Sequence, residues 1–124
     1  MAKAKVRVLV NGYGVIGKRV ADAVAKQDDM ELVGVSDVVA DWRVKMAMKK
    51  GYKVYCSSPD RLDHMKKGGI DVEGLITDVI KDVDVVVDCT PAKVGAKNKE
   101  MYLKYGVKAV FEGGEAHETA GVSF

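Results

Sequence analysis

Three glycines follow a short apolar run near the start of the chain, in an arrangement that could hold an anion. They are spaced Gly12-x-Gly14-x-x-Gly17, between the apolar run 6–10 and a segment of helical apolar spacing. In this context the first glycine permits a tight turn, the second lets a pyrophosphate approach the backbone, and the third lets the helix pack closely on the strand. The first amides of a helix lack internal partners and carry partial positive charge, which favours an anion. The turn predicts a pyrophosphate site; a glycine-rich turn without a ligand is the alternative.

A carboxylate follows the second apolar run at the spacing expected for recognition of a ribose. Asp37 lies 20 positions beyond Gly17, and it follows Ser36 at the end of this run. An acidic residue at about this spacing accepts a hydrogen bond from a ribose 2′-hydroxyl and repels a 2′-phosphate. Asp37 therefore predicts NAD as the cofactor. The alternative is an ordinary turn aspartate that caps the segment before Asp41.

A third polar segment, Cys89-Thr90-Pro91, follows the apolar run 84–88. We expect Thr90 to cap the next helix, with Pro91 at its first position, and the threonine hydroxyl to face the nicotinamide ribose or the pyrophosphate. Cys89 lies near a predicted helix N-terminus, which activates thiols, but a nucleophile also needs a base within reach. The two histidines, His64 and His117, fall in a surface helix and in a polar segment. We therefore expect a structural role for Cys89.

Other residues that could do chemistry are expected to be structural. Asp84 and Asp88 flank an apolar run and are expected to mark the ends of a strand, not to form an acid–base pair. No pattern of metal ligands is present in the sequence, so we predict no metal site. Because Cys89 lacks a base within expected reach, we predict no catalytic residue.

Strands and helices alternate along the chain. The expected strands are 5–10, 30–36, 53–56, 72–74, 84–88 and 108–111, and the expected helices are 15–27, 42–50, 59–67, 77–81 and 91–105. Alternation with right-handed crossovers predicts an α/β fold, a Rossmann-type doubly wound parallel sheet with helices on both faces, as a single domain over 1–124. A ligand is expected beyond the carboxyl ends of the strands, where the strand order reverses.

The overall composition narrows the partners. The net charge is +2, from 20 basic and 18 acidic residues that are interleaved, so neither nucleic acid nor an anionic membrane is the expected partner. We find no apolar run of membrane-spanning length and expect no signal peptide. Two cysteines do not form a disulfide framework, which favours the cytoplasm. Scarce side-chain amides beside 31% charged residues favour a thermophilic source.

Beyond the glycine turn, several segments resemble the archaeal-type phosphorylating glyceraldehyde-3-phosphate dehydrogenases. They are 11–24, 27–31, Asp88-Cys89-Thr90-Pro91, 95–99 and Gly113-Gly114-Glu115. The resemblance runs over essentially the whole chain and implies the N-terminal nucleotide-binding domain of that family. It also implies that the amides of Val15 and Ile16 hold the pyrophosphate, and that Thr90 and the Gly113-Gly114 loop border the nicotinamide.

The candidate cofactor-binding residues share a place in these turns and strand ends. They are Asn11, Gly12, Tyr13, Gly14, Val15, Ile16, Gly17, Ser36, Asp37, Thr90, Pro91, Gly113 and Gly114.

Two departures from the family pattern shape the expected function. The family usually carries a Thr-Lys pair after the second strand, suited to NADP, whereas Ser36-Asp37 stands here and favours NAD, with NADP possible. The family's catalytic cysteine lies in a downstream Ser-Cys-Asn-Thr motif, and its histidine lies further on; the chain ends at Phe124 before either. We therefore expect that the catalytic domain is absent, that the chain binds dinucleotide without turnover, and that the intact enzyme is a homo-oligomer.

Two other functions are alternatives to this interpretation. One is a stand-alone NAD(H)-binding or sensing module without catalytic activity. The other is the cofactor domain of a different aldehyde- or imine-handling dehydrogenase, which the segment 88–91 and Asn98 disfavour.

Overall fold

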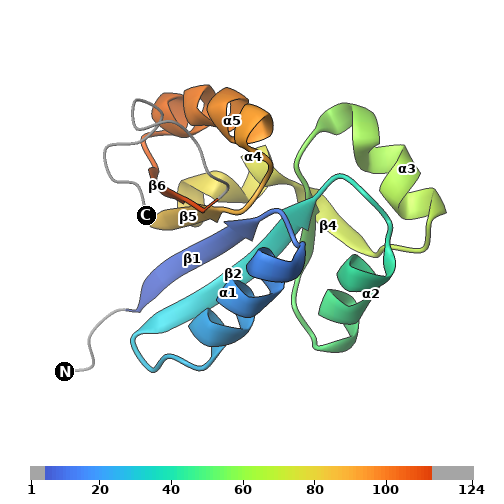
Figure 1. Cartoon of the computed structure of the whole chain (residues 1–124), viewed down its shortest axis with the longest axis horizontal. Helices are drawn as coiled ribbons and strands as arrows, with labels where there is room; N and C mark the ends of the chain where they lie inside the picture. The colour runs from blue at the N-terminus through green and yellow to red at the C-terminus, as the bar shows by residue number, and fades with distance from the viewer. Residues whose placement is uncertain (1–4, 113–124) are drawn as a thin grey trace.

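A six-stranded parallel sheet with helices on both faces forms the molecule in the computed structural model, which describes residues 5–112 (Figure 1). The strands are β1 (Val6–Asn11), β2 (Met30–Asp37), β3 (Val54–Cys56), β4 (Val72–Leu75), β5 (Val85–Asp88) and β6 (Lys108–Phe111). The helices are α1 (Val15–Ala25), α2 (Trp42–Lys49), α3 (Leu62–Lys67), α4 (Ile76–Val79) and α5 (Ala92–Tyr105). Short 3-10 turns at Pro59–Arg61 and Ile80–Asp82 precede α3 and follow α4.

The strand order is β4-β3-β2-β1-β5-β6, so the order reverses at β1. The chain builds outward from β1 to β4, then crosses to the other side of β1 and adds β5 and β6. In register, Asn11 lies opposite Ser36 of β2 and opposite Asp88 of β5. The predicted doubly wound fold is confirmed, and the reversal brings the ends of β2, β1 and β5 side by side.

Two hydrophobic cores lie on opposite faces of the sheet, because successive strand residues point to opposite sides. Val10 belongs to the core that α1, α2 and α3 cover, and its neighbour Leu9 belongs to the core under α4 and α5. Both side chains are fully buried. This burial on two faces explains why the strands read as continuous apolar runs.

Local signals fix some of the helix ends. Asp41 caps α2 as predicted, since its carboxylate accepts hydrogen bonds from the amides of Arg43 (3.0 Å) and Val44 (3.1 Å). The first helix ends at Ala25, two residues before the predicted Gln27, because its last turn tightens to i−3 hydrogen bonds.

The predicted cap of α5 is wrong. The helix begins at Ala92, after Pro91, and no side chain caps it. The hydroxyl of Thr90 donates instead to the carboxylate of Asp88. A buried carboxylate needs hydrogen-bond donors, which explains why it takes the hydroxyl that could have capped the helix.

Candidate functional site

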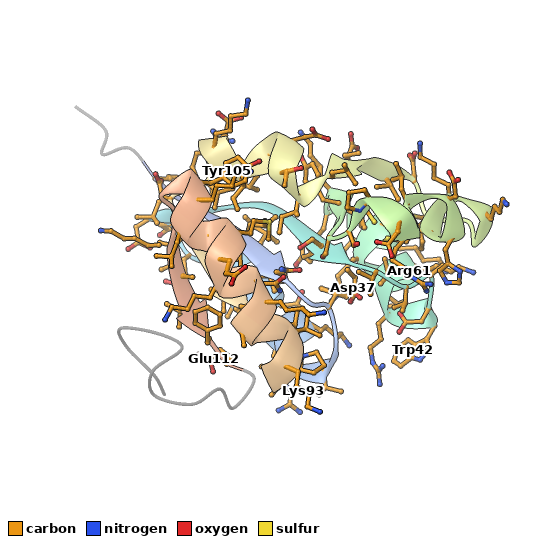
Figure 2. All side chains as sticks on the ribbon, turned by 90° about the horizontal axis from the view of Figure 1, so that it is seen from above. Asp37, Trp42, Arg61, Lys93, Tyr105 and Glu112 are labelled. Carbon is orange, nitrogen blue, oxygen red and sulfur yellow. The ribbon has the colours of Figure 1, made fainter. Side chains whose placement is uncertain are left out.

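A cavity of about 540 Å³ opens at the carboxyl ends of β1, β2, β3 and β5. Its lining includes seven predicted site residues, Asn11, Gly12, Gly14, Ile16, Asp37, Thr90 and Pro91, together with Val38, Ser57, Cys89, Val94, Asn98 and Glu112. In Figure 2, Asp37 lies between α5, which carries Lys93 and Tyr105, and the segments that carry Arg61 and Trp42. The cavity therefore coincides with the reversal of strand order, where doubly wound folds bind ligands.

The glycine turn forms the central wall of this cavity. Gly12 has a positive φ of +95°, and a Cβ there would lie 2.9 Å from the carbonyl carbon of Cys89. A Cβ on Gly17 would lie 1.9 Å from the carbonyl oxygen of Gly12, so only glycine lets α1 approach the strand this closely. A Cβ on Gly14 would meet nothing within 4 Å. The first and third glycines thus shape the turn, and the second leaves open space beside the backbone.

The N-terminus of α1 faces this open space without a competing side chain. Gly14 is the N-cap residue, no side chain caps the helix, and no acidic residue stands in its first turn. The first amide bonded within the helix is that of Lys18, which donates to the carbonyl of Gly14 (2.9 Å). The amides of Val15 and Ile16 precede it and have no partner within the helix. Helix amides without an internal partner, next to the open space at Gly14, fit a pyrophosphate.

Asp37 is tied to the backbone of two turns and also lines the cavity. One carboxylate oxygen accepts from the amide of Tyr13 (2.8 Å), and the other accepts from the amide of Val38 (2.7 Å). Burial raises the pKa of Asp37, and these two hydrogen bonds oppose the rise. A carboxylate has about four acceptor positions, so acceptor capacity remains for a ligand. The turn role is observed, and the ribose role stays a prediction.

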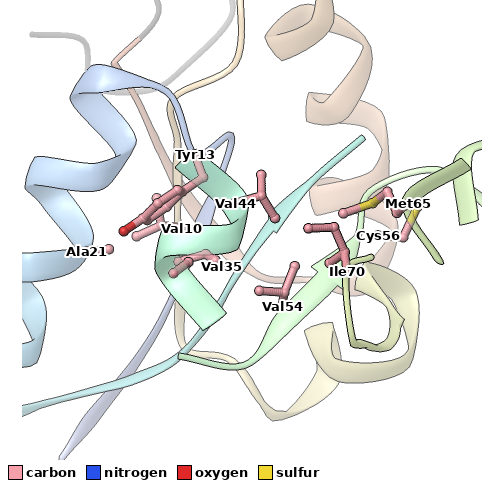
Figure 3. Packing of buried hydrophobic residues seen from close by; sticks show 10 residues of the cluster. Val10, Tyr13, Ala21, Val35, Val44, Val54, Cys56, Met65 and Ile70 are labelled. Carbon is pink, nitrogen blue, oxygen red and sulfur yellow. The ribbon is translucent and has the colours of Figure 1, made fainter. Parts of the chain in front are cut away.

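The remaining residues of the glycine turn face different surroundings. The side chain of Tyr13 points into the core beside Val10, Ala21 and Val35, and only its backbone joins the turn (Figure 3). Its hydroxyl is buried without a hydrogen-bond partner in the described structure. Val15 is 55% exposed.

Asn11 connects the ends of three strands through its side chain. Its oxygen accepts from the hydroxyls of Ser36 (2.8 Å) and Ser57 (2.7 Å), and its nitrogen donates to the hydroxyl of Tyr102 (2.9 Å). Asn11 and Ser36 are fully buried. Ser36 therefore supports the cavity from beneath, whereas Ser57 lines it.

Asp88, at the end of β5, accepts four hydrogen bonds in the described structure. One oxygen accepts from the amide and the hydroxyl of Thr90; the other accepts from Asn98 (3.0 Å) and from the hydroxyl of Tyr102 (2.5 Å). Its side chain is fully buried. Asp88 ends β5, as predicted for a strand-end residue. The sequence did not indicate its hydrogen-bond network, which forms because α5 places Asn98 and Tyr102 over the carboxylate.

Several residues that line the cavity were not among the predicted cofactor-binding residues. Ser57 and Val38 carry no motif of their own, while Asn98 stands one residue before the end of a resembling segment and ten positions after Asp88. Asp84 at the other end of β5 accepts from the amide of Arg7 (2.8 Å), as a strand-end residue can.

The remaining residues discussed from the sequence lie in different parts of the chain. Cys89 lines the cavity in a half-buried position, and His64 is exposed on α3. Gly113, Gly114 and His117 lie outside the described residues. Within residues 5–112, no group of three or more His, Cys, Asp or Glu side chains could hold a metal ion. None of the helices in this described part has the length and apolarity needed to cross a membrane.

Comparison with known proteins gives a family and a set of relatives. Residues 6–114 match the family described as dihydrodipicolinate reductase, N-terminus. The chain is 51% identical to the glyceraldehyde-3-phosphate dehydrogenase of Methanothermus fervidus, over 94% of this chain and 35% of the relative. It is 55% identical to the enzyme of the same name from Methanococcoides burtonii, over 97% of this chain and 36% of the relative. The chain thus spans about a third of the length of these relatives, and the resemblance to archaeal glyceraldehyde-3-phosphate dehydrogenases is confirmed.

Solved structures share the fold. An NAD-binding protein from Listeria innocua superposes with a TM-score of 0.62 at 25% identity, over 86% of this chain and 27% of that one. GenD2 from gentamicin A biosynthesis, in complex with NAD, gives a TM-score of 0.64 at 19% identity, over 88% of this chain and 27% of that one. The family match and the relatives favour a dinucleotide-binding domain over a stand-alone sensing module.

Proposed function

Because the chain belongs to the family described as dihydrodipicolinate reductase, N-terminus, we propose that it binds a nicotinamide dinucleotide as the cofactor-binding part of a glyceraldehyde-3-phosphate dehydrogenase. The observation that carries this proposal is the glycine turn in the cavity wall, where the open space at Gly14 meets the bare amides of α1. The activity is that of the relatives by name, and the chain spans about a third of them.

The residues of the cavity divide the work of holding such a cofactor. The amides of Val15 and Ile16 hold the pyrophosphate, and Asp37 accepts from the adenosine ribose. Thr90, Pro91 and the segment Gly113-Gly114 border the nicotinamide. The bound dinucleotide supplies the hydride acceptor, while this chain supplies its position and electrostatic surroundings.

The remaining parts of the proposal concern the whole protein. Residues 1–124 act as a single cofactor domain without a catalytic residue, and the nucleophile that attacks the aldehyde belongs to the part of the relatives that this chain does not match. The intact enzyme is a cytoplasmic homo-oligomer. The chain alone should bind dinucleotide without oxidising glyceraldehyde 3-phosphate.

Titration of the purified chain with NADH and NADPH, followed by nicotinamide fluorescence, tests both the function and the role of Asp37. We expect tighter binding of NADH, and we expect Asp37→Ala to reduce that preference at least about tenfold, because the repulsion of the 2′-phosphate and one ribose hydrogen bond are lost.

Asp41→Ala is the matched control, because Asp41 caps α2 and does not line the cavity. It should lower stability and leave the NADH-to-NADPH ratio unchanged. A folded chain that binds neither dinucleotide would overturn the proposed function. An unchanged ratio in Asp37→Ala would overturn only the role of Asp37.

A further inference from the structure

The carboxylate of Asp88 is a buried acceptor that receives hydrogen bonds only from uncharged groups in the described structure. Its four donors are the amide and hydroxyl of Thr90, the side-chain amide of Asn98 and the hydroxyl of Tyr102. A carboxylate has about four acceptor positions, so these donors fill it. Four donors around one carboxyl group therefore suit a charged carboxylate.

The direction of the surrounding hydrogen bonds supports this charge. Tyr102 accepts from Asn11 (2.9 Å) and donates to Asp88 (2.5 Å). Burial and the neighbouring Asp88 raise the pKa of Tyr102, so its hydroxyl keeps the proton that it donates. Asn11 in turn accepts from two serine hydroxyls and can present only its amide nitrogen to Tyr102. The whole network points toward Asp88.

The position of this charge relative to the cavity is fixed by the strand order. Asp37 ends β2, the glycine turn follows β1, and Asp88 ends β5, so the turn lies between the two carboxylates. Two of the donors to Asp88, Thr90 and Asn98, also line the cavity. A dinucleotide with its adenosine at Asp37 and its pyrophosphate at the turn extends its other half toward this wall. Asp88 lies behind Thr90 and Asn98 in this wall.

We propose that Asp88 is a buried counter-charge that favours the oxidised, cationic nicotinamide ring over the neutral reduced ring, and that Asn11, Tyr102, Thr90 and Asn98 hold it in place. This proposal rests on the proposed dinucleotide binding. The two oxidation states differ by one positive charge on the ring, and a fixed carboxylate in a poorly polarisable environment distinguishes them without touching the ring. Asp88 is a positioning residue in this role, because it acts through the wall.

The test measures dissociation constants of NAD⁺, NADH and ADP-ribose by calorimetry with the full chain. Asp88→Asn keeps the shape and removes the charge. Asn98 can turn its amide to accept from the new nitrogen, and the hydroxyl of Tyr102 can rotate. We expect this variant to weaken NAD⁺ about fivefold more than NADH, the size of a screened interaction between two unit charges. ADP-ribose, which lacks the nicotinamide ring, should bind within about twofold of wild type.

Tyr102→Phe is the matched control, since it disturbs the same network and keeps the charge. Because both donors of Thr90 and the amide of Asn98 still hold the carboxylate, it should change the ratio of NAD⁺ to NADH affinity less than Asp88→Asn does. Equal weakening of all three ligands in Asp88→Asn would show a purely structural role and overturn the proposal. Failure of wild type to bind any of the three would overturn the proposed function instead, so the two failures are distinguishable.

A second pair of variants covers a folding defect. If Asp88→Asn does not fold, the double variant with Tyr102→Phe removes the hydroxyl that faces the new amide, and it is compared with Tyr102→Phe alone. The same shift in ratio is expected. If neither asparagine variant folds, the wild-type ratio decides: tighter NAD⁺ than NADH supports the counter-charge, and tighter NADH overturns it.

Discussion

Asp37 and Asp88 end the two strands that flank β1, and their carboxylates differ in exposure and in hydrogen-bond partners. Asp37, at the end of β2, lines the cavity and accepts from the backbone amides of Tyr13 and Val38. Asp88, at the end of β5, is fully buried and accepts from three side chains and one backbone amide. The first carboxylate shapes loops that water reaches, and the second organises a closed polar network.

The difference follows from what covers each strand end. A loop leaves β2 toward Asp41, so Asp37 remains open to the cavity. The helix α5 returns over β5 and brings Asn98 and Tyr102 onto Asp88. A group that water can reach keeps spare acceptor positions for a ligand, whereas a buried group must be satisfied within the protein. Cofactor contact is therefore expected at Asp37, and support of the site at Asp88.

The largest expected effect comes from removing each carboxylate in turn. Asp88→Ala leaves four donors, three of them buried, without an acceptor and should lower the free energy of unfolding by at least about 3 kcal/mol. Asp37→Ala removes two hydrogen bonds at a wall that water reaches and should cost about 1 kcal/mol. Urea unfolding followed by far-UV circular dichroism measures both. Equal losses would show that the two strand ends do not differ in this way.

The sequence pointed to Asp37, which lines the cavity, but it did not indicate the buried hydrogen-bond network of Asp88. Asp37 was found because its spacing from Gly17 belongs to a local pattern, and the parallel fold followed from alternating periodicity. The partners of Asp88 lie 2, 10 and 14 positions away. They converge only because α5 packs back over β5. Nothing in the residue types distinguishes this carboxylate from a strand-end aspartate.

The cap of α5 failed for a related reason. Thr90-Pro91 is a good local start signal, but the hydroxyl of Thr90 belongs to the buried network. A tertiary demand for donors overrode a local preference. Local chemistry therefore predicted residues that line the cavity, such as Asp37, and failed for Thr90, whose hydroxyl joins the buried network.

Two of the buried tyrosines, Tyr13 and Tyr102, extend the comparison with a smaller expected effect. Tyr102 belongs to the Asp88 network, and Tyr102→Phe removes a hydroxyl that joins Asn11 to Asp88, so we expect a loss of about 1–2 kcal/mol in the free energy of unfolding. The hydroxyl of Tyr13 is buried without a partner in residues 5–112. Tyr13→Phe should therefore be neutral or stabilising by up to about 1 kcal/mol. Thermal and urea unfolding of the two variants give the difference, and a costly Tyr13→Phe would reveal a partner on the Asp37 side.

The pH dependence of stability gives the finest distinction, because it isolates the charge of Asp37. Burial raises the pKa of Asp37 above its usual value of 3.8, so the folded chain holds this proton to higher pH than the unfolded chain does. Where the folded state binds more protons, stability falls as pH rises. The contribution of Asp37 to stability is therefore largest near or below pH 3.8 and declines as pH rises through the higher folded pKa. Asp37→Asn has no such proton, so its stability relative to wild type should improve as the pH is raised from 4 toward 7. A relative stability that instead worsens over this range would mean that the backbone amides of Tyr13 and Val38 stabilise the charge more than burial opposes it.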